Sequence, residues 1–264
     1  MTREQSMLKR HRGTLAVVAA LTSLLGGMLG GCAPKRTLFP PTALIAPYDT
    51  TKGDALWAVI PPRNESGTTA VDTRSVGDAI VQACESARGV RCLPLNRTIE
   101  AMRAMQLEQI RNPADAEQLA VLLGADGVIA GSVTAYDPYD PPIMGLSLAL
   151  YARPGSLIAQ RRDVVDPYAM TRSYSDTQFQ GSNFQGSPVT VASEILDARD
   201  HSVLMALRDY AEGRSDKDSA LDWRVHVASM DLYTKFAAHQ TVRRLLDEEW
   251  LRLAREVSQQ RRSP

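Results

Sequence analysis

An apolar run near the N-terminus limits how much of this chain can take part in a folded domain. Residues 15–29 (LAVVAALTSLLGGML) follow a start that carries four basic side chains, and Gly30 and Gly31 come directly after the run. This layout is that of a secretory signal peptide. A membrane-spanning helix needs about 20 apolar residues, and this run is shorter and interrupted by glycines and polar residues. We therefore expect residues 1–31 to be removed during export.

Cys32 is the residue at which this segment ends. The sequence Leu29-Gly30-Gly31-Cys32 resembles the lipobox of bacterial lipoproteins. The resemblance implies that Cys32 carries a diacylglycerol on its sulfur, becomes the mature N-terminus and is then acylated, for example with palmitate. Two or more acyl chains hold a protein firmly at a membrane. No aspartate follows Cys32, which by the sorting rule of enteric bacteria favours the periplasmic face of the outer membrane, with the inner membrane and the cell surface as alternatives.

The charge balance of the remaining chain argues against a polyanionic partner. Removal of 31 of the 264 residues leaves 233, enough for one sizeable domain or one domain with an appendage. It also takes four basic residues and Glu4 from totals of 30 basic and 30 acidic side chains, which leaves 26 and 29. No basic block is interleaved with aromatic residues. We therefore expect no nucleic acid partner.

Two cysteines, Cys84 and Cys92, remain beside the lipidated one. The envelope permits disulfides, so a bridge between them is one interpretation, and two small buried apolar side chains are the other. The sequence has no C-x-x-C motif, and His201, His226 and His239 lack the spacing of metal ligands. It also has no Walker A motif and no G-x-G-x-x-G turn. The sequence predicts neither a metal site nor a cofactor.

Residues 32–54 are typical of a tether. They contain four prolines, which favour extended backbone, and no sustained helical or strand period. A spacer of this length would hold a domain several nanometres away from the bilayer.

Residues 55–162 alternate between strand and helix patterns. Asn112-Pro113 and Gly124 delimit one helix, which is expected to bury Leu122 among its apolar residues. The expected fold class is α/β (α+β), a mixed sheet with packed helices in two or three layers, in the order β-α-β-α-α-β-β. The expected strands are residues 55–60, 90–95, 127–135 and 144–151, with 156–160 as an option, and the expected helices are residues 73–87, a segment from Asn96, and residues 114–123.

Two short motifs relate this domain to known envelope proteins. Residues 58–61 (AVIP) and 125–131 (ADGVIAG) resemble the small α/β domain of three bacterial families: the curli-secretion lipoprotein CsgG, the penicillin-binding-protein activator LpoB and the N-terminal domain of TolB. The resemblance covers about residues 55–160 and implies the same architecture, although a fold does not by itself carry a function. CsgG-like domains bear long amphipathic segments that form a membrane pore, whereas this chain shows only a short alternation at residues 146–151.

Residues 163–195 form a polar region, which is expected to be a long loop. The aromatic side chains spaced through it are Tyr168, Tyr174, Phe179 and Phe184. A loop of this length within a domain is unusual and is often functional. We interpret these rings as candidate partner contacts, together with Tyr139 in the proline-rich loop 137–142. The alternative is a loop with a few anchoring rings.

Residues 196–264 are expected to be helical. Asp200 is suited to cap a first helix, and a long amphipathic stretch follows, with a break expected near Ser229 or at residues 238–239. We expect this stretch to fold back over one face of the sheet, because its apolar side needs cover. Docking on a second copy or on a partner is the alternative.

No arrangement of residues indicates catalysis. A G-x-S-x-G motif is absent, Asp137 and Asp140 are typical turn residues before proline, and Glu248 and Glu249 are interpreted as the solvated side of a helix. The sequence predicts no catalytic residue, and an envelope hydrolase has only the compartment in its favour. We expect a non-enzymatic binding or scaffolding role in the envelope, with another envelope protein or a further copy as partner. The alternative is an oligomeric subunit of a secretion or assembly apparatus.

Overall fold

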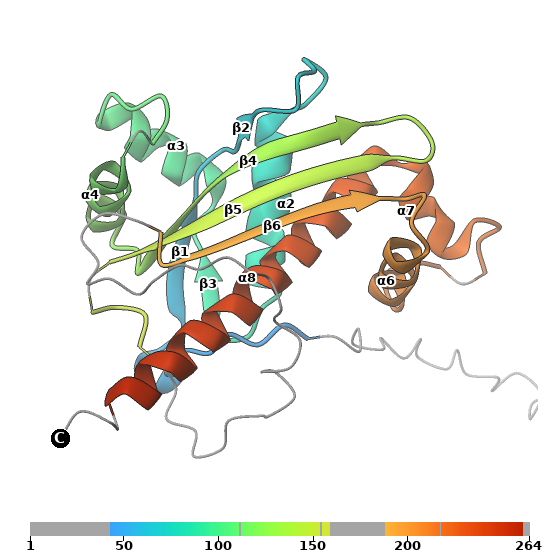
Figure 1. The fold of residues 1–264 in the computed structure, drawn as a ribbon. Coiled ribbons are helices and arrows are strands. Elements are labelled where there is room, and N and C mark those ends of the chain that lie inside the picture. Colours follow the sequence, from blue (N-terminus) through green and yellow to red (C-terminus); the bar gives the residue numbers. More distant parts are fainter. Residues whose placement is uncertain (1–42, 111, 154, 159–187, 217, 261–264) are drawn as a thin grey trace, which may run out of the picture. The chain divides into compact units, whose positions relative to one another are not determined.

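The structure, a computed structural model, describes residues 43–260 except for 111, 154, 159–187 and 217 (Figure 1). The strands in this part of the chain are β1 (Ala55–Val59), β2 (Arg63–Asn64), β3 (Val90–Cys92), β4 (Gly127–Asp137), β5 (Ile143–Ala152) and β6 (Thr190–Asp197). The helices are η1 (Thr50–Lys52), α2 (Thr73–Glu85), α3 (Leu95–Ala104), α4 (Pro113–Leu123), α6 (His201–Ala211), η2 (Asp222–Arg224), α7 (Val225–Ala228) and α8 (Met230–Gln260).

The strands form one mixed sheet in the order β3-β1-β4-β5-β6, with the short β2 paired to β4. The pairs β1–β3, β1–β4 and β2–β4 are parallel. The pairs β4–β5 and β5–β6 are antiparallel. The predicted α/β class with a mixed sheet is confirmed. β4 is the strand at which the parallel half of the sheet meets the antiparallel half.

Helix α4 shows how local sequence sets the element ends. The Asn112 side chain accepts the Asp115 N–H, and the Asp115 side chain accepts the Asn112 N–H, which satisfies two free donors of the first turn. Pro113 occupies the first turn, where no backbone N–H is needed. Gly124 ends the helix in the left-handed region with φ 66°. These predicted boundaries are confirmed.

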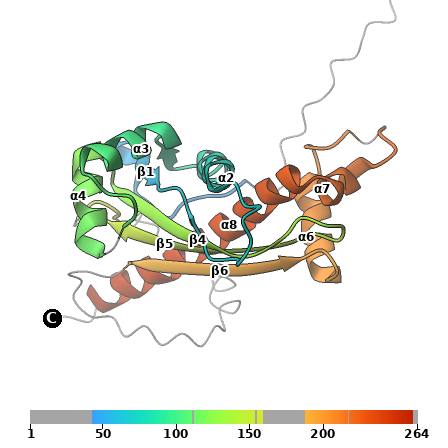
Figure 2. The same ribbon diagram turned by 90° about the horizontal axis from the view of Figure 1, so that it is seen from above.

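The two faces of the sheet have different cover. Neighbouring residues of β1 alternate between two apolar clusters: Trp57 belongs to the cluster under α2 and α8, and Ala58 to the cluster under α3 and α4. Both views place α3 and α4 at one end of the strands and α6 and α7 at the other (Figures 1 and 2). Val191 and Ile195 on the outer face of β6 are exposed. Among the described residues, the domain therefore has three layers (helix, sheet, helix) at α3 and α4, and two layers (helix and sheet) at β6.

Two strand predictions need correction. β6 lies partly within the predicted loop 163–195, because antiparallel pairing with β5 extends the backbone from Thr190 to Asp197. The optional strand at 156–160 is not formed over its described part. There Ser156 belongs to a turn, and its hydroxyl donates to the backbone carbonyls of Asp126 and Arg153. These bonds hold Ser156 in a turn conformation in place of an extended one.

The C-terminal helices fold back onto the sheet, as predicted. α7 and α8 are separated at Ser229, whose backbone is extended with φ −122° and ψ 114°. Tyr233, Phe236 and Leu245 of α8 are fully buried in the cluster under the sheet. The expected break near Ser229 is confirmed, whereas α8 continues through residues 238–239.

Two buried histidines lie against one tyrosine where α6, α7 and α8 meet. The ring centroid of Tyr210 is 4.9 Å from that of His239 and 5.6 Å from that of His226. Neither ring nitrogen of His239 has a hydrogen-bond partner among the described residues. Burial lowers the pKa of His239 to about 4 and also lowers the pKa of His226. The fold therefore holds both rings in their neutral form near pH 7.

We predict that His239 makes the domain sensitive to acid. Between about pH 6.5 and pH 4, the unfolded chain binds a proton at this position that the native state does not bind. The free energy of unfolding therefore falls as the pH falls, by up to about 3 kcal/mol from this residue. Denaturant unfolding at several pH values should show a weaker loss on acidification for His239→Leu than for wild type. His201→Leu, at an exposed position of α6, is the control. Equal pH dependence in all three proteins would contradict the prediction.

Candidate functional site

The described chain begins with an extended segment, residues 43–49, that is built into the domain. Leu44, Ala46 and Tyr48 point inward and are buried. Ala46 donates its N–H to the Arg88 carbonyl at 2.9 Å, and Arg88 returns an N–H to the Leu44 carbonyl at 2.9 Å. Residues 44–48 therefore belong to the folded domain rather than to the tether predicted over 32–54. The backbone hydrogen bonds and buried side chains of this segment outweigh the preference of a proline-containing stretch for solvent.

A buried carboxylate holds this segment in place. Glu249 of α8 is fully buried and accepts the Tyr48 hydroxyl at 2.9 Å. It also accepts the Thr190 hydroxyl from β6 and two N–H groups of Arg252, both at 2.8 Å. We call these four residues the Glu249 junction. The junction joins the entering chain, the start of β6 and the C-terminal half of α8. The prediction that Glu249 lies on the solvated side of a helix is therefore wrong.

The electrostatics of the Glu249 junction keep its donors protonated. Burial, followed by the charge and hydrogen bond of Glu249, raises the pKa of Tyr48 well above its ordinary value. Burial alone would lower the pKa of Arg252, but its bonds and charge attraction to Glu249, with a further contribution from Glu256, raise it overall. A carboxylate whose acceptor sites are filled in this way has a structural role. Tyr48 and Arg252 therefore both stay protonated at neutral pH.

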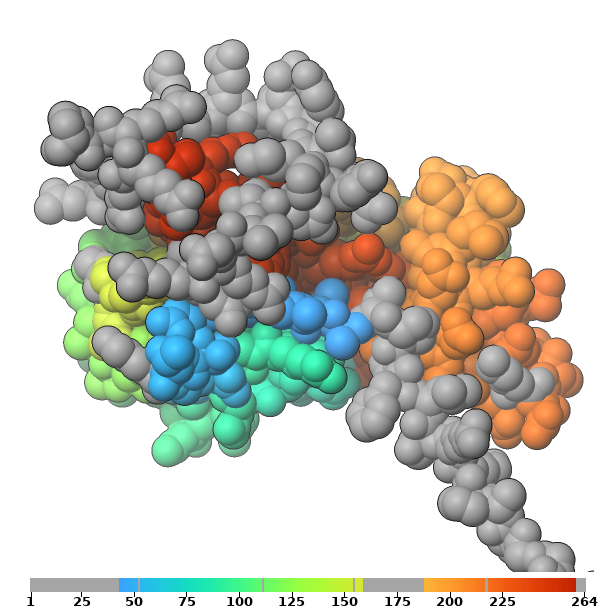
Figure 3. Space-filling model, turned by 90° about the horizontal axis from the view of Figure 1, so that it is seen from below, coloured from blue at the N-terminus to red at the C-terminus, as the bar shows by residue number. Residues whose placement is uncertain are grey.

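Two further contacts fasten the entering segment. The Trp250 Nε1–H donates to the Ile45 carbonyl at 3.1 Å, and the Asp49 N–H donates to the Ile158 carbonyl at 3.1 Å. Tyr48 also meets Trp57 edge to face, with ring centroids 5.9 Å apart. Figure 3 shows the blue start of the described chain on the face seen from below. The point at which the chain enters the domain is therefore fixed.

Of the candidate partner contacts, Tyr139 is the one that lies within the described residues. It occupies the turn between β4 and β5 and is 79% exposed. Its backbone N–H donates to the Asp137 side chain at 3.2 Å, which shapes the turn locally. Cys32 and the four loop aromatics at 168–184 lie outside the described residues. The structure therefore presents one of the predicted contacts at an exposed turn and does not test whether they act together.

Cys84 and Cys92 are buried, free thiols in the structure. A side-chain hydrogen bond with Cys92, and then burial, raise the pKa of Cys84 well above its ordinary value. A thiol with a raised pKa is a poor nucleophile. The two side chains lie close enough for this bond, and a disulfide between them in the envelope stays a prediction.

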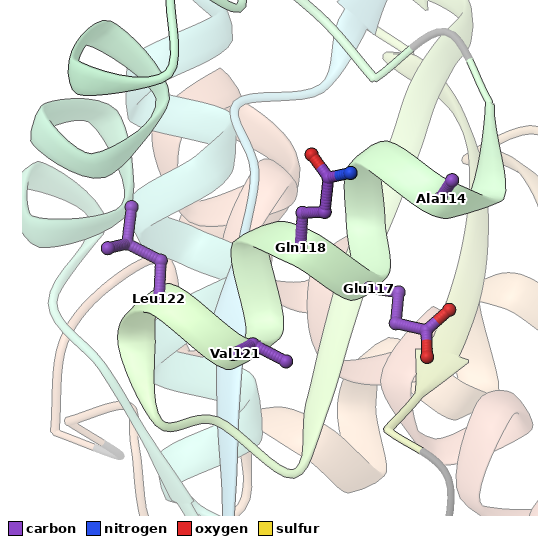
Figure 4. A pocket seen from close by; sticks show the side chains of 5 residues that line it. All are labelled: Ala114, Glu117, Gln118, Val121 and Leu122. Atoms are coloured by element: carbon purple, nitrogen blue, oxygen red, sulfur yellow. The ribbon is translucent and has the colours of Figure 1, made fainter.

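An open hollow lies along α4 (Figure 4). It has a volume of about 520 Å³, and the residues that line it are Ala114, Glu117, Gln118, Val121 and Leu122. Leu122 is exposed, contrary to the prediction, because α4 buries Ala116, Leu119 and Ala120 instead. All five lining residues come from one helix and supply one carboxylate. The hollow therefore lacks converging groups that would indicate a catalytic site.

The described ranges contain neither a metal-binding cluster nor a membrane-spanning helix. No three histidine, cysteine, aspartate or glutamate side chains there lie close enough to hold a metal ion. None of the helices described is both long and apolar enough to cross a membrane.

Comparisons with known proteins give only weak structural similarities. No protein-family model matches the chain, and no curated protein matches it. A lipoprotein from Neisseria meningitidis is similar at 17% identity and a TM-score of 0.33, over 61% of this chain and 96% of that one. The LpoB C-terminal domain from Escherichia coli is similar at 14% identity and a TM-score of 0.30, over 49% of this chain and 83% of that one.

A PelC dodecamer from Paraburkholderia phytofirmans is similar at 19% identity and a TM-score of 0.27, over 45% of this chain and 69% of that one. This chain covers 64% of the PelC chain in a second, variant structure. These identities and TM-scores are too low to assign a family or a function.

We predict that the Glu249 junction contributes strongly to stability. Glu249→Gln removes the ion pair with Arg252 and should lower the free energy of unfolding by about 3–5 kcal/mol. Tyr48→Phe removes one hydrogen bond to a charged group and should lower it by about 1.5–3 kcal/mol. Because both changes act on the same carboxylate, their effects should not add in the double variant. Denaturant unfolding measures all three values.

Glu248→Gln is the matched control, since it removes the partly exposed ion pair of Glu248 with Arg244. A loss of less than about 1 kcal/mol is expected there. Hydrogen exchange at the Ala46 amide should rise in Glu249→Gln and stay unchanged in Glu248→Gln. Equal losses of stability at positions 248 and 249 would exclude the proposed role of the junction.

Proposed function

We propose that this chain is a lipid-anchored protein of the bacterial envelope with a non-enzymatic binding or scaffolding role. Its lipid would be carried by Cys32, and its domain would face the periplasm from the outer membrane. The lipobox-like sequence before Cys32 supports the anchor. The observation that carries the proposal is the Glu249 junction, because it ties the chain to the domain core soon after the anchor position.

The position of this attachment sets the reach of the domain. The first residue that the structure describes is residue 43, and ten residues, 33–42, lie between it and Cys32. A fully extended chain of this length spans about 40 Å at most. An anchored domain on such a tether would be confined to a thin layer next to the bilayer. Confinement raises the effective concentration toward a partner in the same layer without any new contact.

Recognition is assigned to the turn between β4 and β5. Tyr139 has a large, mostly exposed ring at the end of two long paired strands. Tyrosine is enriched at protein interfaces, because its ring supplies contact area at a low cost in conformational entropy. A rigid hairpin that presents one aromatic side chain is suited to a contact with a fixed envelope partner.

We predict that Cys32→Ala releases the protein from the membrane. Wild type should fractionate with the outer membrane, and mass spectrometry of its N-terminus should show an acylated Cys32. The variant should lose the acyl groups and move to the soluble fraction, because the acyl chains are its proposed attachment to the membrane. A wild-type protein that is soluble and unacylated would end the proposal. Cys92→Ala serves as the control and should leave the fractionation unchanged.

We predict that position 139 contacts the partner. A photoreactive phenylalanine analogue placed there should give one adduct of discrete mass after irradiation of cells. The same analogue at Leu122, which is 56% exposed on α4, is the matched control and should give none. Equal adduct yields at both positions, or none at either, would argue against the hairpin as a contact.

The same experiment bears on the alternative role as an oligomeric subunit. β6 ends the sheet order and exposes Val191 and Ile195, and an exposed edge strand can pair with another copy. Adducts whose masses are multiples of the chain mass would favour this alternative.

A further inference from the structure

We propose that the face at which the chain enters the domain is a membrane-contact surface, and that its occupant is the lipid headgroup layer in which Cys32 is anchored. The proposal rests on the lipid anchor of the proposed function. The surface consists of Ile45, Ile158 and Trp250, which we call the entry patch.

Ile45 is exposed where a polar residue would be expected. Residues 43–49 are extended, and the buried Leu44 and Ala46 flank Ile45, which is 45% exposed. On an extended edge segment with one face in the core, outward positions are usually polar. Ile158 is 59% exposed and lies against the same segment, because its carbonyl accepts the Asp49 N–H.

Trp250 adds an aromatic ring beside Ile45. Its indole N–H donates to the Ile45 carbonyl, and its side chain is half-buried. Ala254 and Val257 follow at i+4 and i+7 on the same helix face and are also half-buried. Tryptophan is enriched at membrane–water interfaces, where its apolar ring and polar edge are both accommodated. The composition of the entry patch therefore fits a headgroup layer.

The tether explains why this patch and no other exposed apolar residue would meet lipid. Ten residues lie between Cys32 and residue 43, the first residue that the structure describes, and Ile45 follows two positions later. An anchor at Cys32 would therefore keep the entry patch within about 40 Å of the bilayer. Because the anchor already holds the domain at the bilayer, the contact of the entry patch with the headgroups is intramolecular. A few apolar side chains are therefore enough for a large fraction of molecules to make this contact. Ile195 is 66% exposed, but it lies on β6, away from the entering segment.

The test uses fluorescence quenching by lipid. The mature chain from Cys32 is coupled through that thiol to a maleimide phospholipid in vesicles of phosphatidylethanolamine and phosphatidylglycerol with brominated acyl chains. The burial of Cys84 and Cys92 protects them from the maleimide. A Trp223→Phe background leaves two emitters, the fully buried Trp57 and Trp250. Trp250→Phe in the same background measures the Trp57 signal alone.

We expect the bromine to quench the Trp250 emission. Ile45→Asp and Ile158→Asp, made separately, should each restore most of it, and Ile195→Asp should leave the quenching as in wild type. Unfolding midpoints of the variants should stay near that of wild type, because the replaced side chains are largely exposed. Unquenched Trp250 emission in wild type would overturn the proposal. Quenching that all three aspartate variants leave unchanged would also overturn it. A shift in the Trp250 emission wavelength that depends on protein density on the vesicle, and not on bromine, would indicate contact with a second copy and would overturn it too.

The two proposals fail in different ways. The coupling supplies the lipid chemically, so the quenching result does not depend on whether cells acylate Cys32. An unacylated Cys32 in cells would end the proposed function. Unquenched emission together with an acylated Cys32 in cells would end the entry patch alone.

Discussion

A single buried carboxylate determines how the outer parts of this domain are joined. Glu249 receives hydrogen bonds from Tyr48, Thr190 and Arg252, which come from three separate regions of the chain. A buried charge is stable only when its partners are present and its acceptor sites are filled. The entering segment, the start of β6 and the end of α8 must therefore adopt their positions together. The sheet and its two apolar clusters form the core of the domain, and the junction fixes the position at which the chain enters it.

This arrangement separates the region where the chain enters the domain from the exposed turn between β4 and β5. The entering segment contacts Trp250 of α8 and Ile158, the last residue described before position 159. The β4–β5 turn carries its exposed tyrosine at the far end of two paired strands. A protein that must be held at a surface and still reach a partner needs such a separation between attachment and recognition. The cover of the sheet follows the same division, since α3 and α4 protect β1 and β4 while β6 stays open on its outer face.

Much of the fold was predictable because its signals are local. Asn112, Pro113 and Gly124 mark the ends of α4 through backbone chemistry that involves only near neighbours. The apolar run that forms most of β4 is long enough to be recognised as a central strand. β6 was missed because Ser193 and Glu194 interrupt its apolar residues next to a polar region, and it becomes a strand through its register with β5.

The Glu249 junction was not predictable in the same way. Glu248 and Glu249 are adjacent and chemically identical, yet one is partly exposed beside Arg244 and the other is fully buried. One local signal was present, because position 249 falls in line with Leu245 and Leu253 on the apolar side of α8. The burial of His226 and His239 was not predictable for a related reason, since their surroundings are assembled from α6, α7 and α8 together.

The sequence separation within the junction has a consequence for the order of events during synthesis. Tyr48 and Glu249 are 201 residues apart, and a contact of that span forms only after a large loop has closed. The entering segment cannot be locked until α8 has left the ribosome and, in an exported chain, has crossed the membrane. Until then the chain lacks its last layer, and its central strands keep exposed apolar side chains. Such a chain stays competent for threading through a narrow translocation channel and becomes rigid only when its final helix arrives.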